Sequence, residues 1–184
     1  MRTRGSGTWT AVVWVVLTMS LPLLPGAGAS AGGGTVDNAW ELPPLVLEDQ
    51  EGEKRGLYDW HGKVILLNFW ATWCRPCQVE IPDLIGYQRE YGSQGLQVVS
   101  VGIDELRKLR NFARTVRINY PVLVADPRGG HALLKRWGDP NGVLPFTVVI
   151  APDGHLTFMR VGMFDDEAFE SYVLPLLSPQ QEQT

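Results

Sequence analysis

The chain has 184 residues, of which 45% are hydrophobic and 20% charged, with two cysteines and a formal net charge of −4. This length suits a domain that buries its own core without disulfide bonds, and two cysteines are too few for a disulfide-rich scaffold. The acidic balance argues against nucleic acid as a partner, because phosphate binding needs clustered Lys and Arg. Apolar residues are plentiful along the chain, which excludes a disordered protein.

The first 29 residues have the layout of a secretory signal peptide. Arg2 and Arg4 precede an uncharged apolar stretch over 9–24, and Ala27-Gly28-Ala29 supplies the small residues that a signal peptidase reads. An uncleaved membrane anchor is the alternative, but a helix over this stretch would span only about 24 Å of a bilayer core of about 30 Å. Cleavage leaves 14 basic and 20 acidic residues, a net charge of −6, and places both cysteines outside the reducing cytosol.

The rest of the chain is expected to hold a single domain, which we expect to be a monomer. A flexible linker is predicted over 30–41, where three consecutive glycines stand at 32–34. The folded domain is predicted over 42–178, and a polar tail over 179–184 follows it.

Strand and helix patterns alternate along this domain. A polar turn at 49–52 between two short apolar segments, 45–47 and 54–57, predicts an opening β-hairpin. Nearly continuous apolar runs over 64–70 and 96–103 predict strands that are buried on both faces. A helix is predicted between them over 76–91, with Pro82 as a kink.

The second half of the domain continues the alternation. Asp104 is predicted to cap a helix whose apolar residues have helical spacing, namely Leu106, Leu109, Phe112, Ala113 and Val116. The further predicted elements are a strand at 122–124, a helix at 132–137, a hairpin of strands at 146–150 and 156–161, and a helix from Asp165 or Asp166 toward Leu177. Parallel strands joined by helices predict an α/β sandwich.

Both cysteines lie in the segment Trp73-Cys74-Arg75-Pro76-Cys77, between a predicted buried strand and the helix that follows it. Their spacing places the two sulfurs one helical turn apart, close enough to form a disulfide. The helix N-terminus and the charge of Arg75 favour the thiolate of Cys74, which is the nucleophile in disulfide exchange. Pro76 in the first helical turn fixes the backbone. The pattern therefore predicts a redox-active dithiol.

A structural disulfide and a metal site are the alternatives to redox chemistry. Closing a loop of two residues constrains the unfolded chain little, so a structural disulfide here would add little stability. A four-ligand zinc or copper site would need further cysteines. A copper-binding module that uses only Cys74, Cys77 and a histidine remains the alternative to an enzyme. We expect no metal, and no cofactor other than the redox-active Cys74–Cys77 disulfide.

The stretch Phe69-Trp70-Ala71-Thr72-Trp73-Cys74-Arg75-Pro76-Cys77 resembles the active-site segment of thioredoxin-fold proteins. Together with Gly62-Lys63-Val64 and Glu80-Ile81-Pro82, it is most similar to the exported thiol-disulfide oxidoreductases of the TlpA/ResA-like family, over residues 42–177. This resemblance implies a thioredoxin-like sandwich, in which helices flank a central mixed β-sheet with an N-terminal β-hairpin extension. It also implies that Cys74 attacks the substrate disulfide and that Cys77 resolves the mixed disulfide. It also implies that Glu80 tunes proton transfer; an ordinary solvated helix residue is the alternative.

A second segment, Val143-Leu144-Pro145-Phe146-Thr147, resembles the loop that carries the cis-proline of this family and lines its substrate groove. The resemblance implies substrate contacts from Leu144 and Pro145, beside those of Trp73, Arg75 and Pro76 next to the reactive sulfur. A trans proline that opens a strand is the alternative. Phe146 departs from the Thr common after that proline, and the Glu found there in cytochrome-maturation reductases of the CcmG/DsbE type is absent.

Asn68 stands where thioredoxins proper carry a buried Asp, so any proton-accepting role falls to Glu80. The resemblance implies a periplasmic or otherwise extracytoplasmic reductase of disulfides in exported proteins, with the cysteines of apocytochrome c as candidate substrates. It further implies re-reduction by a membrane electron donor of the CcdA or DsbD kind. A disulfide oxidase or isomerase of the same fold is the alternative, because direction depends on the redox potential.

Overall fold

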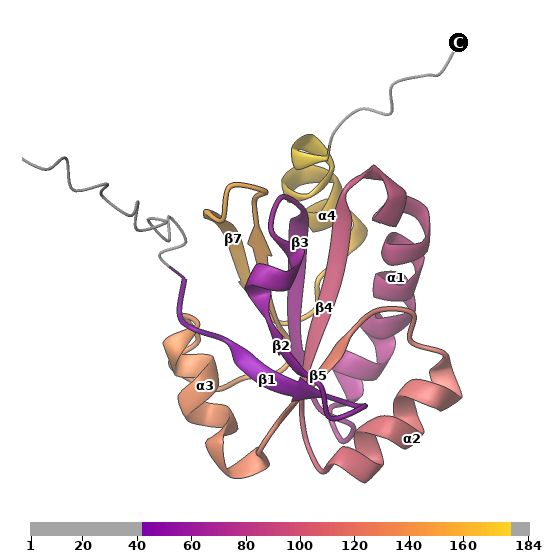
Figure 1. Cartoon of the computed structure of the whole chain (residues 1–184), viewed down its shortest axis with the longest axis vertical. Helices are drawn as coiled ribbons and strands as arrows, with labels where there is room; N and C mark the ends of the chain where they lie inside the picture. Colours follow the sequence, from indigo (N-terminus) through magenta and orange to yellow (C-terminus); the bar gives the residue numbers. More distant parts are fainter. Residues whose placement is uncertain (1–41, 178–184) are drawn as a thin grey trace, which may run out of the picture. The chain divides into compact units, whose positions relative to one another are not determined.

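The computed structural model describes residues 42–177, in which helices pack on both faces of a mixed β-sheet (Figure 1). The predicted leader, the linker over 30–41 and the tail over 179–184 lie outside the described residues. The strands are β1 (Val46–Asp49), β2 (Lys54–Gly56), β3 (Val64–Trp70), β4 (Leu96–Ile103), β5 (Val122–Ala125), β6 (Phe146–Ile150) and β7 (Leu156–Val161). Their order across the sheet is β2-β1-β5-β4-β3-β6-β7. The predicted thioredoxin-like sandwich with an N-terminal hairpin is confirmed.

The centre of the sheet is parallel and its edges are antiparallel. β4 runs parallel to β3 and β5, because helical crossovers connect these strands. β6 and β7 extend the sheet antiparallel on one side, and the β1–β2 hairpin does so on the other. β3 and β4 are buried along their whole length, as their apolar runs predict.

The helices of the described residues are α1 (Arg75–Tyr91), α2 (Leu106–Val116), α3 (Gly130–Arg136) and α4 (Asp166–Tyr172). Short 3-10 helices cover Leu57–Trp60, Gly92–Gln94, Pro127–Gly129 and Leu174–Leu176. Figure 1 shows α1 and α2 on one side of the sheet and α3 on the other, in agreement with their buried clusters. Across residues 42–177, no helix has both the length and the apolar character needed to cross a membrane.

Side chains alternate between the two faces of β3, and each set packs against different helices. Leu66 and its neighbours on one face pack with Leu84 of α1 and Phe169 of α4. Leu67 and its neighbours on the other face pack with Trp137 at the end of α3. Asn68 lies on the α1 face and is fully buried, so this polar side chain must find its partners inside the core.

The ends of two helices differ from the predictions. Glu105 rather than Asp104 is the residue before α2, and the Asp104 carboxylate instead accepts a hydrogen bond from the Glu105 N–H at 2.7 Å. The last helix, α4, ends at Tyr172 because Pro175 lacks the N–H that would continue it, and the chain turns into a 3-10 helix instead. Its start is as predicted, with Asp165 capping it through the N–H of Ala168 at 3.0 Å. α1 runs on through Pro82 as a single helix.

Candidate active site

The two cysteines lie at the junction of β3 and α1. Cys74 is the N-cap of α1, and its sulfur accepts a hydrogen bond from the Cys77 N–H at 3.3 Å. The residues form a disulfide with a Cα–Cα distance of 5.3 Å. Cys74 is 4% exposed and Cys77 is fully buried, so Cys74 is the sulfur nearer to solvent. The order of access fits an attacking role for Cys74 and a resolving role for Cys77.

The loop before Cys74 is held from two sides. The Thr72 hydroxyl donates a hydrogen bond to the Asp104 carboxylate at the end of β4. The Gln78 side-chain amide donates to the Thr72 carbonyl oxygen at 2.7 Å, which ties the loop to the first turn of α1. These bonds present Trp73 to solvent with 70% of its surface exposed, and Arg75 and Pro76 are also exposed. The three predicted substrate contacts of this loop therefore lie on the surface next to Cys74.

The Leu144–Pro145 peptide bond is cis, as the resemblance implies. Half-buried Leu144 packs against the apolar cluster that contains both cysteines, so the structure brings this loop to the disulfide. Buried Asp139 holds the loop from behind: its carboxylate accepts hydrogen bonds from the N–H groups of Asn141 at 3.0 Å and Val143 at 2.6 Å. Pro145 is buried, and its carbonyl oxygen accepts a hydrogen bond from the Gly162 N–H at 2.8 Å.

Glu80 is fully buried on α1, which makes the alternative of a solvated helix residue wrong. Its Oε1 accepts a hydrogen bond from the Asn68 Nδ2 at 2.7 Å, and its Oε2 accepts one from the Phe164 N–H at 2.8 Å. The Asn68 Nδ2 also donates to the Thr147 hydroxyl at 3.0 Å. The position of the buried acid of thioredoxins is thus occupied by an amide that binds a carboxyl group from the facing helix.

Burial dominates the proton affinity of this carboxyl group. Desolvation raises the pKa of Glu80 from 4.5 to about 7, against the opposing effect of the hydrogen bonds from Phe164 and Asn68. The charge of Asp83 raises the pKa further, and that of Arg160 lowers it. A carboxyl group that titrates near neutral pH can both give and take a proton under ordinary conditions.

Sequence reasoning missed several residues of this site. Thr147 reads as an ordinary strand residue, and its contact with Asn68 follows only from the pairing of β3 with β6. Exposed Met163 lies between Gly162 and Phe164, whose N–H groups bind Pro145 and Glu80. No local pattern singles out this loop. Four exposed apolar residues belong to the segments of this site, and we call them the apolar rim. Trp73 and Val79 flank the cysteines in sequence, Val143 lies in the cis-proline loop, and Met163 precedes Phe164, whose N–H binds Glu80.

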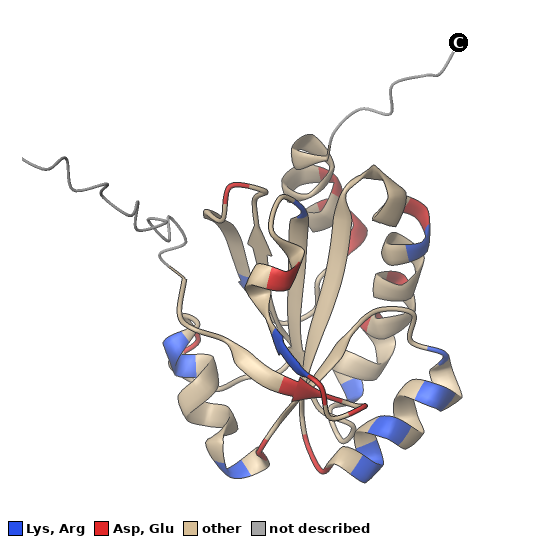
Figure 2. Ribbon diagram, viewed as in Figure 1, with Lys and Arg blue, Asp and Glu red and all other residues tan. Residues whose placement is uncertain are grey.

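Basic side chains gather on α2, which begins next to the cysteine loop (Figure 2). Lys108 forms ion pairs with Asp104 at 3.5 Å and Glu105 at 2.9 Å. Arg110 donates hydrogen bonds to the Gln50 carbonyl oxygen in the turn after β1. These contacts pair Lys108 and Arg110 with neighbouring groups. Within the cysteine motif itself, Arg75 is an exposed cation.

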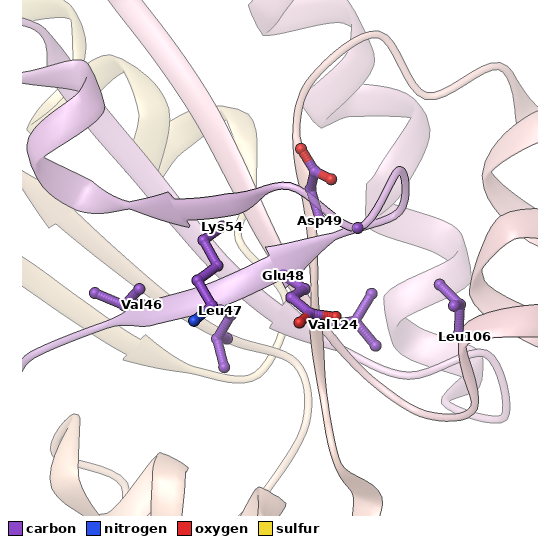
Figure 3. A pocket seen from close by; sticks show the side chains of 8 residues that line it. Val46, Leu47, Glu48, Asp49, Lys54, Leu106 and Val124 are labelled. Atoms are coloured by element: carbon purple, nitrogen blue, oxygen red, sulfur yellow. The ribbon is translucent and has the colours of Figure 1, made fainter.

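A separate pocket lies between β1, β5 and the start of α2 (Figure 3). Its lining includes Val46, Glu48, Lys54, Leu106 and Val124, and contains neither cysteine, nor Glu80, nor the cis-proline. Within residues 42–177, no group of three or more His, Cys, Asp or Glu side chains is placed to hold a metal ion.

Comparison with known proteins places the chain among thioredoxin-fold redox proteins. Residues 39–159 match the AhpC/TSA family. The chain is 31% identical over 144 residues to the thiol-disulfide oxidoreductase ResA of Bacillus subtilis, which covers 78% of each chain. It is 34% identical over 140 residues to the thioredoxin-like protein YneN of the same organism, covering 73% of this chain and 78% of that one. A crystal structure of a protein described as a putative thiol:disulfide interchange protein DsbE, from Chlorobium tepidum, superimposes with a TM-score of 0.64 at 29% identity, covering 74% of this chain and 94% of that one.

Proposed function

Since the chain belongs to the AhpC/TSA family and is a thiol-disulfide oxidoreductase of the ResA type, we propose that it acts as a reductase of disulfides in extracytoplasmic proteins. The observation that carries the proposal is the Cys74–Cys77 pair at the N-terminus of α1, with Cys74 nearer to solvent and the Leu144–Pro145 loop packed against it. Cys74 is 4% exposed and its partner one turn away is fully buried, and this difference in access suits exchange between Cys74 and a disulfide of another protein.

The reducing half-reaction starts from the dithiol form. The Cys74 thiolate attacks one sulfur of the substrate disulfide, forming a mixed disulfide and releasing the other substrate sulfur as a thiolate. Cys77 then loses its proton and attacks the Cys74 sulfur, which releases the second substrate thiolate and forms the Cys74–Cys77 disulfide seen here. Two electrons pass to the substrate, whose two sulfurs take up protons.

Stabilisation of the Cys74 thiolate comes from the local backbone. Its sulfur already accepts the Cys77 N–H at the start of α1, where the helix dipole favours negative charge. The exposed guanidinium of Arg75 adds a full positive charge in the same turn. Both effects lower the cost of forming the attacking thiolate.

Glu80 supplies the proton acceptor for the resolving step in this proposal. It lies one helical turn beyond Cys77 and is buried on the same helix, and burial raises its pKa to about 7. A carboxylate of that basicity takes the Cys77 proton as the resolving thiol becomes a nucleophile and returns it when the cycle restarts. Asn68 holds the carboxylate through the 2.7 Å hydrogen bond.

Substrate polypeptide is expected to lie across the apolar rim and the Leu144–Pro145 loop. The rim residues are exposed although they are large and apolar, a combination that marks an interaction surface when such residues are grouped. Candidate substrates are exported proteins with cysteine pairs, among them apocytochrome c. A membrane electron donor of the CcdA or DsbD kind would return the disulfide to the dithiol, and no resident cofactor takes part.

An extracytoplasmic location follows in this proposal from the leader predicted over 1–29, with a mature protein that begins at or near Ser30. Sequencing the N-terminus of the protein from the cell envelope tests it. A start at or near Ser30 is the expected result. An intact segment over 2–24 would mean that the leader is a membrane anchor.

The direction of exchange and the roles of the two cysteines are tested with serine variants. Cys77→Ser is expected to accumulate mixed disulfides with substrate proteins because the resolving thiol is missing, whereas Cys74→Ser loses both turnover and trapping. Trapping by Cys74→Ser instead would show that the roles are reversed. Metal analysis of the purified protein, alongside thiol-trapping mass shifts, distinguishes this function from copper binding.

A further inference from the structure

Four buried polar atoms on the α1 face of the sheet lack a hydrogen-bond partner within the described part of the chain. One of them, the Trp70 Nε1, belongs to the last residue of β3, opposite Gly102. The other three are the Asn68 Oδ1, the Ser100 Oγ and the Tyr120 hydroxyl. Burying such groups without partners is costly, and native proteins satisfy nearly all of them with protein atoms or with ordered water. Three such atoms on one face of the sheet are therefore expected to share a hydrogen-bond partner.

Strand register places the Asn68 and Ser100 atoms side by side. Asn68 on β3 pairs with Thr147 on β6 and with Ser100 on β4, so the three side chains form a row across the sheet. The Asn68 Nδ2 is bound to Thr147 on the β6 side and to Glu80 above the sheet. The Oδ1 is the other branch of the same planar amide, so it points away from Thr147 and toward Ser100.

Tyr120 reaches the same region from the chain segment before β5. The Pro121 carbonyl oxygen accepts a hydrogen bond from the Ser100 N–H at 3.0 Å, which places Tyr120 next to Ser100. The Asn119 side chain donates to the Ile85 carbonyl oxygen at 3.1 Å and so ties this segment to α1. Tyr120 is buried in the same apolar cluster as Val98 of β4 and Leu84 of α1. Burial, together with the charge of Glu80, raises the pKa of its hydroxyl.

The three atoms complement a water molecule. Asn68 Oδ1 only accepts hydrogen bonds, whereas each of the two hydroxyl groups can donate one and accept others. A water can donate to the amide oxygen and exchange bonds with both hydroxyls, and buried waters typically make about three such bonds. We propose that Asn68, Ser100 and Tyr120 form a buried binding site for water beside Glu80, which makes Ser100 and Tyr120 positioning residues for that carboxyl group.

The consequence concerns the orientation of the Asn68 amide. A water that donates to Oδ1 favours the rotamer whose Nδ2 faces Glu80, and this N–H donor stabilises the ionised carboxylate. Without the water, the orientation of the amide is held only by the two bonds of its Nδ2, to Thr147 and to Glu80, and the hydrogen bond to the carboxylate weakens. Loss of the site therefore tightens proton binding by Glu80.

Other groups around Glu80 must be held constant in a test. Asp83 faces it from its own helix, Arg160 from β7, and the Phe164 N–H from the loop after β7. Arg160 is paired with Asp165 at 2.8 Å, and Asp83 is coupled to Asp166 of α4. The two cysteines of α1 do not titrate in the disulfide form, so that form is the one to measure.

The test measures the protonation of the Glu80 carboxyl group directly, by isotope-edited infrared or NMR titration of the full chain in the disulfide form. Tyr120→Phe and Ser100→Ala are each expected to bind the Glu80 proton about three- to tenfold more tightly, which follows from the loss of one ordinary hydrogen bond. Tyr172→Phe is the matched control, because Tyr172 is exposed at the end of α4 and its hydroxyl is not part of the site. It should leave the Glu80 titration unchanged.

A high-resolution crystal structure gives the second readout. We expect a water within hydrogen-bond distance of Asn68 Oδ1, Ser100 Oγ and the Tyr120 hydroxyl. Absence of density between these atoms overturns the proposal, as does a Glu80 titration that is the same in the wild type, Tyr120→Phe and Ser100→Ala. If Tyr120→Phe does not fold, the Glu80 titration of Ser100→Ala and the crystal structure still test the proposal. Neither readout depends on disulfide reductase activity, so failure here is separate from failure of the proposed function.

Discussion

The burial of Glu80 makes the stability of the protein depend on pH in a direction opposite to that of most carboxyl groups. Its pKa is about 7 in the folded protein and 4.5 in the unfolded chain. Below pH 4.5 both states carry the proton, and the contribution of Glu80 to stability is at its most favourable. Between pH 4.5 and about 7 the unfolded chain releases the proton first, so stability falls as pH rises, and above that range the loss is complete. The difference between the two pKa values corresponds to roughly 1.36 kcal/mol for each pH unit, so the free energy of unfolding falls by about 3 kcal/mol in all.

Glu80→Gln removes this dependence because the glutamine side chain is neutral at every pH. The free energy of unfolding of the variant minus that of the wild type should rise by about 2–3 kcal/mol between about pH 5 and pH 8. Taking the difference cancels the other titrating groups. Among them, Asp49, Asp104 and Asp165 have lowered pKa values and act below this window. The assay is urea unfolding of both proteins in the disulfide form, followed by tryptophan fluorescence. A difference that stays constant over this range would refute the burial argument.

Three further predictions concern the site. Glu80→Gln removes a nearby negative charge and should therefore shift the pH dependence of Cys74 alkylation to lower pH. It should also slow turnover of protein disulfides by about tenfold. Superimposable alkylation curves and equal turnover in wild type and variant would show that Glu80 has no role. Trp73→Ala should lower kcat/KM for protein disulfides by about fivefold or more, while leaving the fold and the reaction with a small aromatic disulfide unchanged, and an equal loss with both substrates would contradict a docking role. Asp139→Ala should lower the free energy of unfolding by about 1–3 kcal/mol, because the N–H groups of Asn141 and Val143 lose their acceptor, and urea unfolding checks this; unchanged stability would mean that the carboxylate does not hold the loop.

The parts of the structure that follow from local pattern were predictable. The apolar runs of β3 and β4 identify buried strands, and the placement of Cys74 and Cys77 between β3 and a helix identifies the reactive pair. Helix ends were less predictable, because the choice between Asp104 and Glu105 before α2 depends on the bond of Asp104 to Thr72. That bond joins residues 32 positions apart in the chain.

The surroundings of Glu80 could not be derived from local pattern. The hydrogen bond from the Phe164 N–H to Glu80 joins residues 84 positions apart, and the Asn68–Thr147 hydrogen bond joins residues 79 positions apart. Such contacts depend on strand register and on the path of the loop after β7, neither of which leaves a periodic signal in the sequence. The cis state of Pro145 was implied by resemblance alone, since a trans proline is also compatible with the start of a strand.

The midpoint potential of the Cys74–Cys77 couple tests the proposed direction of electron flow most directly. A buried carboxylate one turn from Cys77 disfavours thiolates in the reduced form, and this favours a reducing couple. Equilibration with glutathione or dithiothreitol buffers, followed by thiol trapping and mass analysis, gives the value. We expect a potential nearer to the roughly −270 mV of thioredoxin than to the roughly −120 mV of a strong dithiol oxidase. A value near the latter would contradict a reductase and indicate an oxidase of the same fold.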